Sequence, residues 1–358
     1  MINVTKVWLP NKKKYISYID KIYSSGWLTN GGPLLRELEE KLADYLGVKH
    51  IILVSNGTAA LQISYKILDL NGSAITTPFS FVATTNSLIS NCIMPSFADI
   101  DPNTLNIDPE KVEGRITEDT EAIVAVHVFG NPCDIERLED IGKKYNLRVI
   151  YDAAHAFGSE YKNETVLKYG DISTLSFHAT KLFHTIEGGA ICLNDEDQVQ
   201  KARELINFGI AEDGTVRKAG INAKMNEFEA AMGLCLLDDL PHIFEKREEV
   251  YKRYIDSLSG YVKLQSFNPY GKQNYSYFPV LFKNEEKTKH VLNALKQKKV
   301  HPRRYFYPSL DTLPYLQKEQ VCPVSREIAS KILCLPLYPD LGTKEQDIII
   351  DTIKKAID

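Results

Sequence analysis

Short apolar segments alternate with helical segments along the first two thirds of the chain. The apolar segments predict strands buried on both faces, at residues 51–54, 73–77, 93–98, 122–128, 148–151, 173–177 and 190–193. Apolar residues at helical spacing predict helices at 35–46, 59–68, 81–90 and 135–145. This alternation is typical of an α/β fold with a mostly parallel sheet covered by helices on both faces. Ligands bind such sheets at the carboxyl ends of the strands.

The pattern changes near residue 240. A long charged helix is expected at 243–258, Tyr-rich and Pro-rich segments follow, and a last helix is expected at 344–357. We therefore predict a large domain at residues 1–240, which includes an N-terminal arm, and a smaller α+β domain at residues 241–358.

Lys181 and Asp152 each follow a predicted strand. Asp152 directly follows the segment at 148–151, and Lys181 lies in a polar, small-residue turn that leads to Gly188-Gly189. An amine and a carboxylate aimed into one cleft are the groups that a pyridoxal phosphate (PLP) enzyme requires. The amine bonds the cofactor as a Schiff base, and the carboxylate keeps the pyridine nitrogen protonated. A lone lysine is more often a solvated side chain, so the hypothesis depends on the rest of the site.

Ser55-Asn56-Gly57-Thr58 joins a predicted strand to a predicted helix and is a candidate phosphate cradle. Gly57 lets the backbone approach a ligand closely, the N–H groups at the helix start favour an anion, and Thr58 adds a hydroxyl. The alternative is a plain helix cap, since Ser, Asn and Thr all cap helices well.

Two further residues are candidates for contact with the cofactor ring. Phe81 follows the strand at 73–77 and could cover the pyridine, and His155, three residues after Asp152, could contact the ring hydroxyl or orient the aspartate. Core packing is the commoner role for such an aromatic side chain, and most lone histidines have neither function.

Composition and missing motifs exclude several other classes. The 358 residues are 44% hydrophobic and 25% charged, as in an ordinary soluble globular protein, and a net charge of −4 gives no basic footprint for nucleic acid. No apolar run could span a membrane, no secretion signal is evident, and the six scattered cysteines lack a C-x-x-C pair, which predicts a cytoplasmic protein with free thiols. The motifs of nicotinamide dehydrogenases, nucleotide phosphatases, zinc hydrolases and serine hydrolases are absent. An EF-hand-like segment has Thr104 where glycine is required, so no metal is expected.

Together these segments resemble the DegT/DnrJ/StrS family of sugar aminotransferases, which are fold-type I PLP enzymes. The resemblance covers nearly the whole chain and runs through residues 26–31, 55–61, 77–84, 97–102, 127–132, 152–155, 176–189 and 220–227. It implies an aspartate-aminotransferase-like fold and pyridoxal 5'-phosphate as the cofactor.

The resemblance also implies roles for single residues. Lys181 takes the Schiff-base position, Asp152 the pyridine-nitrogen position and Phe81 the stacking position. The positions that match the family's phosphate contacts are Gly57, Thr58 and Ser176.

Asn222 matches an asparagine that reaches the phosphate from the neighbouring subunit, which implies an obligate homodimer with shared active sites. Lys224 stands where the family usually has arginine, which leaves a local salt bridge in doubt.

The resemblance implies transfer of an amino group from L-glutamate to a nucleotide-linked keto sugar. The segment at 177–189 is most similar to enzymes that aminate dTDP-4-keto-6-deoxy-D-glucose at C4, whose product, dTDP-4-amino-4,6-dideoxy-D-glucose, is a precursor of surface polysaccharides such as O-antigen. The candidate contacts with this substrate, each with core packing as the alternative, are Trp27, His184, Glu187, Tyr305 and Tyr307.

Three alternatives stay open. The enzyme could act on a UDP or GDP keto sugar or at C3, it could be a PLP-binding sensor without activity, or it could dehydrate a sugar. Relatives that act as dehydratases carry His in place of the Schiff-base lysine, so Lys181 argues against the last of these.

Overall fold

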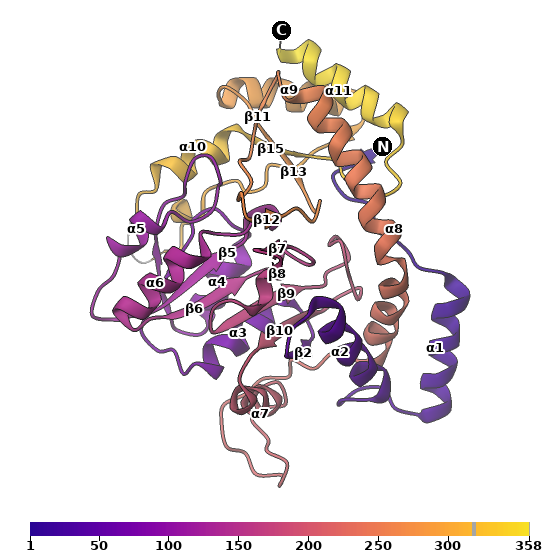
Figure 1. The fold of residues 1–358 in the computed structure, drawn as a ribbon, viewed down its shortest axis with the longest axis vertical. Helices are drawn as coiled ribbons and strands as arrows, with labels where there is room; N and C mark the ends of the chain where they lie inside the picture. The colour runs from indigo at the N-terminus through magenta and orange to yellow at the C-terminus, as the bar shows by residue number, and fades with distance from the viewer. Residues whose placement is uncertain (317–319, 358) are drawn as a thin grey trace.

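A seven-stranded sheet forms the centre of the computed structural model, which describes residues 1–316 and 320–357 (Figure 1). Its strands are β2 (His50–Val54), β3 (Ser73–Thr76), β4 (Met94–Phe97), β5 (Thr120–Val126), β6 (Arg148–Asp152), β9 (Ile172–Ser176) and β10 (Gly189–Leu193). They lie in the order β2-β10-β9-β6-β5-β3-β4. Only β10 runs antiparallel to its neighbours, β2 and β9. The predicted mostly parallel sheet is therefore confirmed, and every strand overlaps its predicted range.

Helices cover both faces of this sheet. They are α2 (Pro33–Leu46), α3 (Gly57–Ile67), α4 (Val82–Ser90), α5 (Pro109–Glu113), α6 (Ile135–Tyr145) and α7 (Glu196–Leu205). Helix α1 (Lys12–Ser25) packs instead against α8 (Glu227–Leu258). Alternate side chains of β2 enter different apolar clusters: Ile51 and Leu53 pack in the cluster that includes α2 and α6, whereas Ile52 and Val54 pack with α3 and α7. This alternation follows from the two-residue period of a strand and explains why β2 is apolar throughout.

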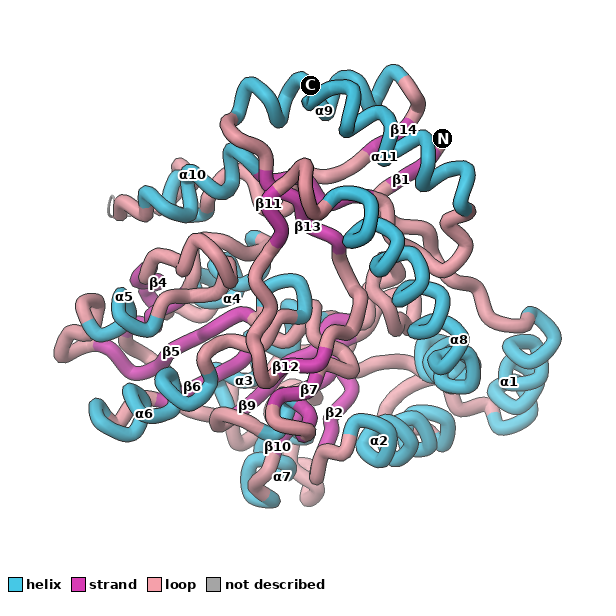
Figure 2. The backbone as a smooth tube through the Cα atoms, turned by 45° about the horizontal axis from the view of Figure 1, so that its top comes forward, coloured by secondary structure: helices cyan, strands magenta, loops and turns pink. Residues whose placement is uncertain are grey.

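The C-terminal third packs around an apolar cluster of its own. Its elements are β11 (Lys263–Leu264), β13 (Phe278–Leu281), α9 (Glu285–Gln297), β14 (Val300–His301), α10 (Pro323–Lys331), β15 (Ile332–Leu335) and α11 (Thr343–Ile357). Strand β1 (Ile2–Asn3) pairs in parallel with β14, and Ile2 belongs to this cluster. The first residues of the chain thus pack against the C-terminal third, although we predicted the N-terminal arm to belong to the large domain. Figure 2 shows both chain ends on this side of the molecule.

One predicted helix boundary is wrong. Helix α8 (Glu227–Leu258) is a single element of 32 residues with Pro241 inside it, whereas the sequence predicted a helix only from residue 243. Asn226 accepts from the amides of Phe228 and Glu229 and so begins the helix well before the proline. Figure 1 shows α8 running along one edge of the molecule. The helix contributes to both main clusters, so a boundary at residue 240 falls within a continuous helix, and the division into two domains stays a prediction.

Glu227 joins the starts of α8 and α2. Its carboxylate is buried and accepts from the amides of Leu34 and Leu35, each at 2.9 Å, in the first turn of α2. We expect Glu227→Ala to lower the free energy of unfolding by about 2–3 kcal/mol, because it leaves two buried donors unpaired. Urea titration measures the loss. Glu37→Ala, which removes only an exposed pair with Lys41, is the control and should cost less than about 0.5 kcal/mol. Equal losses would contradict the role of Glu227.

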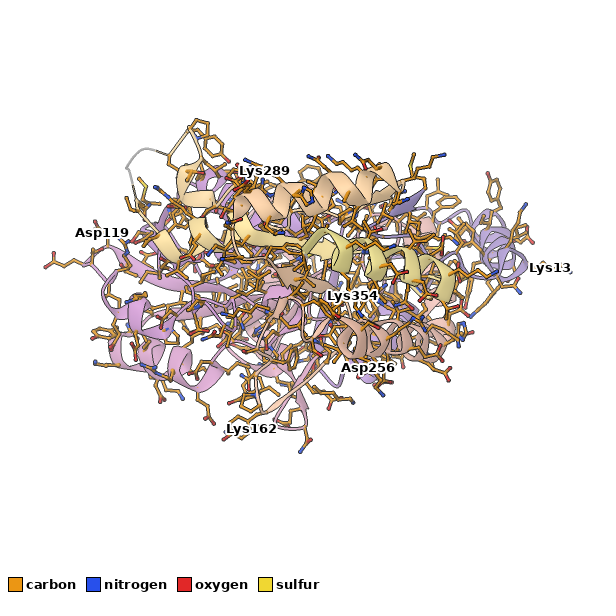
Figure 3. All side chains as sticks on the ribbon, turned by 90° about the horizontal axis from the view of Figure 1, so that it is seen from above. Lys13, Asp119, Lys162, Asp256, Lys289 and Lys354 are labelled. Carbon is orange, nitrogen blue, oxygen red and sulfur yellow. The ribbon has the colours of Figure 1, made fainter. Side chains whose placement is uncertain are left out.

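Charged side chains project outward from this fold, as the labelled lysines and aspartates in Figure 3 show. Across the described residues, no helix has the length and apolar character that a membrane crossing requires. A small three-stranded sheet completes the fold: β12 (Gly271–Lys272) pairs with β7 (Glu160–Tyr161), which pairs with β8 (Glu164–Thr165).

Candidate active site

A cavity of about 370 Å³ lies at the carboxyl ends of the central strands. It is where the topology predicts a ligand site, because Val126 ends β5, Asp152 ends β6 and Ser176 ends β9. The predicted site residues that line it are Gly57, Thr58, Phe81, Asp152, His155, Ser176, Lys181, Glu187 and Tyr305. The structure thus brings together residues that are more than 200 positions apart in the sequence.

One end of the cavity is the N-terminus of α3. Asn56 accepts from the amide of Ala59 at 2.8 Å, so it caps the helix as the alternative interpretation expected. The cap leaves the first amides of the helix, those of Gly57 and Thr58, without a partner in the helix itself. A Cβ atom built on Gly57 would lie 2.8 Å from Cβ of Ser176, so only glycine lets β9 approach this helix end. Amides, a hydroxyl and a helix dipole there fit a phosphate group.

Asp152 lies on the floor of the cavity and is 5% exposed. The Thr84 hydroxyl donates to Oδ2 at 2.8 Å, and the amide of Ala154 donates to Oδ1 at 3.1 Å. Burial raises the pKa of Asp152 above its usual value, while these two hydrogen bonds and the charge of Lys181 oppose the rise. A buried carboxylate with donors on both oxygens fits the protonated nitrogen of a PLP ring.

Lys181 lies in a closed turn between β9 and β10. The amide of Phe177 donates to the carbonyl of Gly188 at 2.8 Å, and the amide of Lys181 donates to the carbonyl of His178 at 2.8 Å. The side-chain amine donates to the hydroxyl of Tyr277 at 3.3 Å. Burial lowers the pKa of Lys181 to about 8, against the opposing charge of Asp152. A lysine held in this way is half neutral at about pH 8 rather than at 10.5, and its neutral form can act as a nucleophile or base.

His155 and Phe81 lie on the cavity wall. Nδ1 of His155 accepts from the amide of Phe129 at 3.3 Å, which places the ring proton on Nε2. Burial lowers the pKa of His155 well below its usual value, so the ring is neutral and Nε2 is a donor. Phe81 precedes α4 and is 57% exposed. Both positions fit the predicted contacts with a cofactor ring, and neither side chain is simply part of the core.

Other predicted site residues lie outside the cavity. The exposed residues Asn222, Trp27 and Tyr307 do not line it. The ring of Tyr307 packs against Arg304, whose Cζ atom lies 3.5 Å from the ring centre. His184 is 1% exposed, and its Nε2 lies 2.8 Å from the carbonyl of Trp8. In the isolated chain His184 therefore packs in the interior, the alternative that the sequence left open.

Lys224, which stands in place of the family's usual arginine, forms a single hydrogen bond of 2.9 Å to Asn207 and lies over the ring of Phe208. It has no carboxylate partner within the described part of the chain. The salt bridge expected of the family's arginine therefore has no counterpart at Lys224 among the described residues.

The lining residues that were not predicted include Thr84, Tyr277 and Arg303. Thr84 was within a quoted motif, but its hydrogen bond to Asp152 joins residues 68 positions apart. Tyr277 and Arg303 come from the C-terminal third, where no motif pointed to the site. Among the described residues, no group of three His, Cys, Asp or Glu side chains could hold a metal ion.

The lowered pKa of Lys181 can be measured in the cofactor-free protein. We expect its acylation by acetic anhydride, followed by peptide mass spectrometry, to reach half its maximum rate near pH 8, because only the neutral amine reacts. Lys162 is the control: its hydrogen bond to Glu136 raises its pKa, so it should stay unreactive in this range. Indistinguishable profiles for Lys181 and Lys162 would contradict the assignment.

The lowered pKa of Lys181 also affects stability. Burial of its charged amine destabilises the fold fully below pH 8, and this cost falls between about pH 8 and 10.5 as the amine loses its proton, so the contribution of Lys181 to stability rises with pH there.

Two curated relatives align along essentially the whole chain. The dTDP-4-amino-4,6-dideoxy-D-glucose transaminase of Shigella dysenteriae is 44% identical, with 99% of this chain and 98% of the relative covered. The Escherichia coli protein of the same name is 38% identical, with 99% and 97% covered. The solved structure of DesI in the presence of its TDP-sugar product superposes with a TM-score of 0.93 at 34% identity, over 99% of this chain and 93% of that chain.

The cavity residues that fit a phosphate group, a ring and an amine all lie within the region that these relatives match. The DegT/DnrJ/EryC1/StrS aminotransferase family profile matches residues 10–354. The predicted fold type, that of the fold-type I PLP enzymes, is confirmed by the sugar aminotransferases among the superposed structures. The chain belongs to the DegT/DnrJ/EryC1/StrS family of PLP-dependent sugar aminotransferases.

Proposed function

We propose that this enzyme transfers the amino group of L-glutamate to C4 of dTDP-4-keto-6-deoxy-D-glucose and forms dTDP-4-amino-4,6-dideoxy-D-glucose. The observation that carries the proposal is the full-length similarity to the Shigella dysenteriae transaminase of that product. The cavity is compatible with it, since it combines a cofactor site with charged and aromatic groups at its mouth. The product would serve the synthesis of surface polysaccharide in the cytoplasm, where the six unpaired cysteines stay reduced.

Different residues of the cavity would bind different parts of PLP. The amides of Gly57 and Thr58 and the hydroxyl of Ser176 would bind its phosphate, and Asp152 would hold its ring nitrogen in the protonated form. When bound, PLP supplies a carbonyl carbon that carries the amino group and a ring that accepts electrons.

The second pair of contacts fixes the ring in place. His155 would donate from Nε2 to the ring hydroxyl, and Phe81 would cover one ring face.

Lys181 is the proton carrier of the reaction. Its Nζ would hold the cofactor and, as a free amine, would carry a proton to or from the substrate carbon that gains or loses nitrogen. The lowered pKa suits both directions of transfer, because the amine is then poised near neutral pH. Tyr277, whose pKa burial raises, stays a neutral phenol and positions the amine.

The working enzyme is a homodimer with shared sites. Several large apolar side chains are exposed: Trp27, Phe81, Ile186 and Phe208 are each at least 45% exposed, and of these Phe81 lines the cavity. Such side chains favour burial in an interface. Asn222 lies outside its own cavity, which is consistent with a contact to the phosphate of the partner's cofactor.

Mixing two inactive variants tests the shared sites. Equal amounts of Lys181→Ala and Asn222→Ala chains, unfolded and refolded together, should regain about a quarter of wild-type activity, because half of the random dimers are mixed and each has one intact site. Failure to regain activity would contradict a contribution of Asn222 across the interface. Light scattering checks the dimer mass.

The visible spectrum of the PLP-loaded enzyme tests the reaction itself. L-glutamate should remove the absorption band of the bound cofactor, and dTDP-4-keto-6-deoxy-D-glucose should restore it. NMR of the product then shows whether the amine is at C4 or C3. A band that glutamate leaves unchanged would favour a sensor or a dehydratase, and restoration by a UDP or GDP keto sugar alone would overturn the proposed substrate.

A further inference from the structure

Arg303 and Arg304 are adjacent in the sequence but have different surroundings. Arg304 donates to Glu285 at 3.2 Å and to the carbonyls of Ala329 and Ser330, so it ties α9 and α10 together. Arg303 lines the cofactor cavity instead and is exposed. Within residues 1–316 and 320–357 its guanidinium takes part in no ion pair or hydrogen bond and lies 6.0 Å from the ring centre of Tyr305.

The other charged groups of the cavity are already matched. Asp152 is buried with its two donors, Lys181 belongs to the cofactor, and Glu187 lies 3.6 Å from His178. Arg303 is therefore the charged lining group without a protein partner in the described part of the chain. A guanidinium offers several fixed donors and matches an anion with paired oxygen atoms.

Two aromatic rings separate Arg303 from Lys181. The amine of Lys181 lies 5.9 Å from the ring centre of Tyr277, the rings of Tyr277 and Tyr305 are 6.1 Å apart, and Arg303 follows 6.0 Å beyond Tyr305. The cation thus lies two ring contacts away from the amine, and the side chain of Arg303 is exposed whereas that of Lys181 is half-buried.

This displacement distinguishes the diphosphate of a nucleotide sugar from the α-carboxylate of glutamate. The α-carboxylate of glutamate is one bond from the carbon that reacts, so it must stay beside Lys181. In a 4-keto sugar nucleotide the diphosphate is attached across the hexose ring from C4. A sugar with C4 at Lys181 therefore carries its diphosphate away from the buried end of the cavity.

We propose that Arg303 binds the diphosphate of the nucleotide sugar and holds the sugar with its keto carbon at Lys181. This inference rests on the proposed function for the class of substrate, a nucleoside diphosphate sugar, but not on the identity of the base. The backbone of Arg303 is fixed independently of its side chain, because its amide and carbonyl exchange hydrogen bonds of 3.2 and 2.7 Å with Cys334 in β15.

Calorimetric titration of the PLP-loaded enzyme with dTDP and with thymidine tests the contact. Arg303→Gln should weaken dTDP binding about tenfold, while the affinity for thymidine, which lacks the diphosphate, changes less than about twofold. Arg303→Lys should fall between the two, because it keeps the charge but loses the paired donors. Arg137→Gln, which removes an exposed arginine from α6, is the control and should match the wild type.

Two results would overturn the assignment. One is unchanged dTDP affinity in Arg303→Gln. The other is general distortion of the site. It would appear as an equal loss of affinity for dTDP and thymidine, or as an equally large rise in the L-glutamate concentration that removes half of the cofactor absorption band. UDP and GDP are titrated in parallel. If the enzyme binds UDP or GDP but not dTDP, the proposed sugar is wrong. The role of Arg303 is then tested by the loss of affinity of Arg303→Gln for that nucleotide relative to its loss for the corresponding nucleoside.

Discussion

Lys181→Ala is expected to abolish turnover, with a loss of about ten-thousandfold or more. The variant lacks both the amine that bonds PLP and the base that moves the proton, and each contribution alone is worth two or more orders of magnitude. Steady-state formation of the amino sugar measures the loss. Addition of L-glutamate to the PLP-treated variant should not convert the cofactor to its amine form on the time scale of wild-type turnover.

The variant should keep its fold and its dimer. Lys181 forms one long hydrogen bond through its side chain, and the turn that carries it is held by backbone contacts. Circular dichroism and light scattering check this expectation. Lys162→Ala, which removes an exposed lysine from the hairpin loop near β7, is the matched control and should retain full activity. A Lys181→Ala enzyme that still turns over would show that another group carries the amino transfer.

The strands of the central sheet were predictable because each is a short segment with an apolar centre that is followed by a polar turn. The long helix α8 was not, because Pro241 is the residue type that most often ends a helix. Its start depends instead on Asn226 and on burial of Glu227 against α2, and burial is decided by the tertiary fold. Strand β1 was missed because two residues carry no periodic pattern and pair with β14, far away in the sequence.

The candidate site divides in the same way. Gly57, Asp152 and Lys181 stand at strand ends, so their position in the sequence already implies a common cleft. Tyr277 and Arg303 reach that cleft from the C-terminal third, and only the packing of that third against the sheet brings them there.

Among the softer predictions, Glu187 and Tyr305 line the cavity, whereas the side chain of His184 is directed to Trp8. An aromatic or histidine next to a motif does not reveal on which side of a turn its side chain lies.

Asp152→Asn is expected to lower the rate of both half-reactions about a thousandfold while PLP still binds. The amide has nearly the shape of the carboxylate but cannot hold a proton on the ring nitrogen by charge. The hydroxyls of Ser80 and Thr84, 2.8 Å apart, can reverse their direction of donation to suit an amide, so the fold should persist. Cofactor content and the rate at which L-glutamate removes the absorption band measure the two effects. A variant with normal rates would contradict the role of Asp152.

Thr84→Val is a milder test of the same carboxylate, because it removes one hydrogen-bond donor to Asp152 and keeps the carboxylate itself. The Thr84 hydrogen bond opposes the rise that burial causes in the pKa of Asp152, so its loss should raise that pKa further. The acid limb of the pH–rate profile should then move to higher pH, so that the variant loses more rate relative to the wild type as the pH falls. Thr84→Ser keeps the hydroxyl and should keep the wild-type profile. An acid limb that stays in place in Thr84→Val would mean that the charge of Asp152 does not limit the reaction.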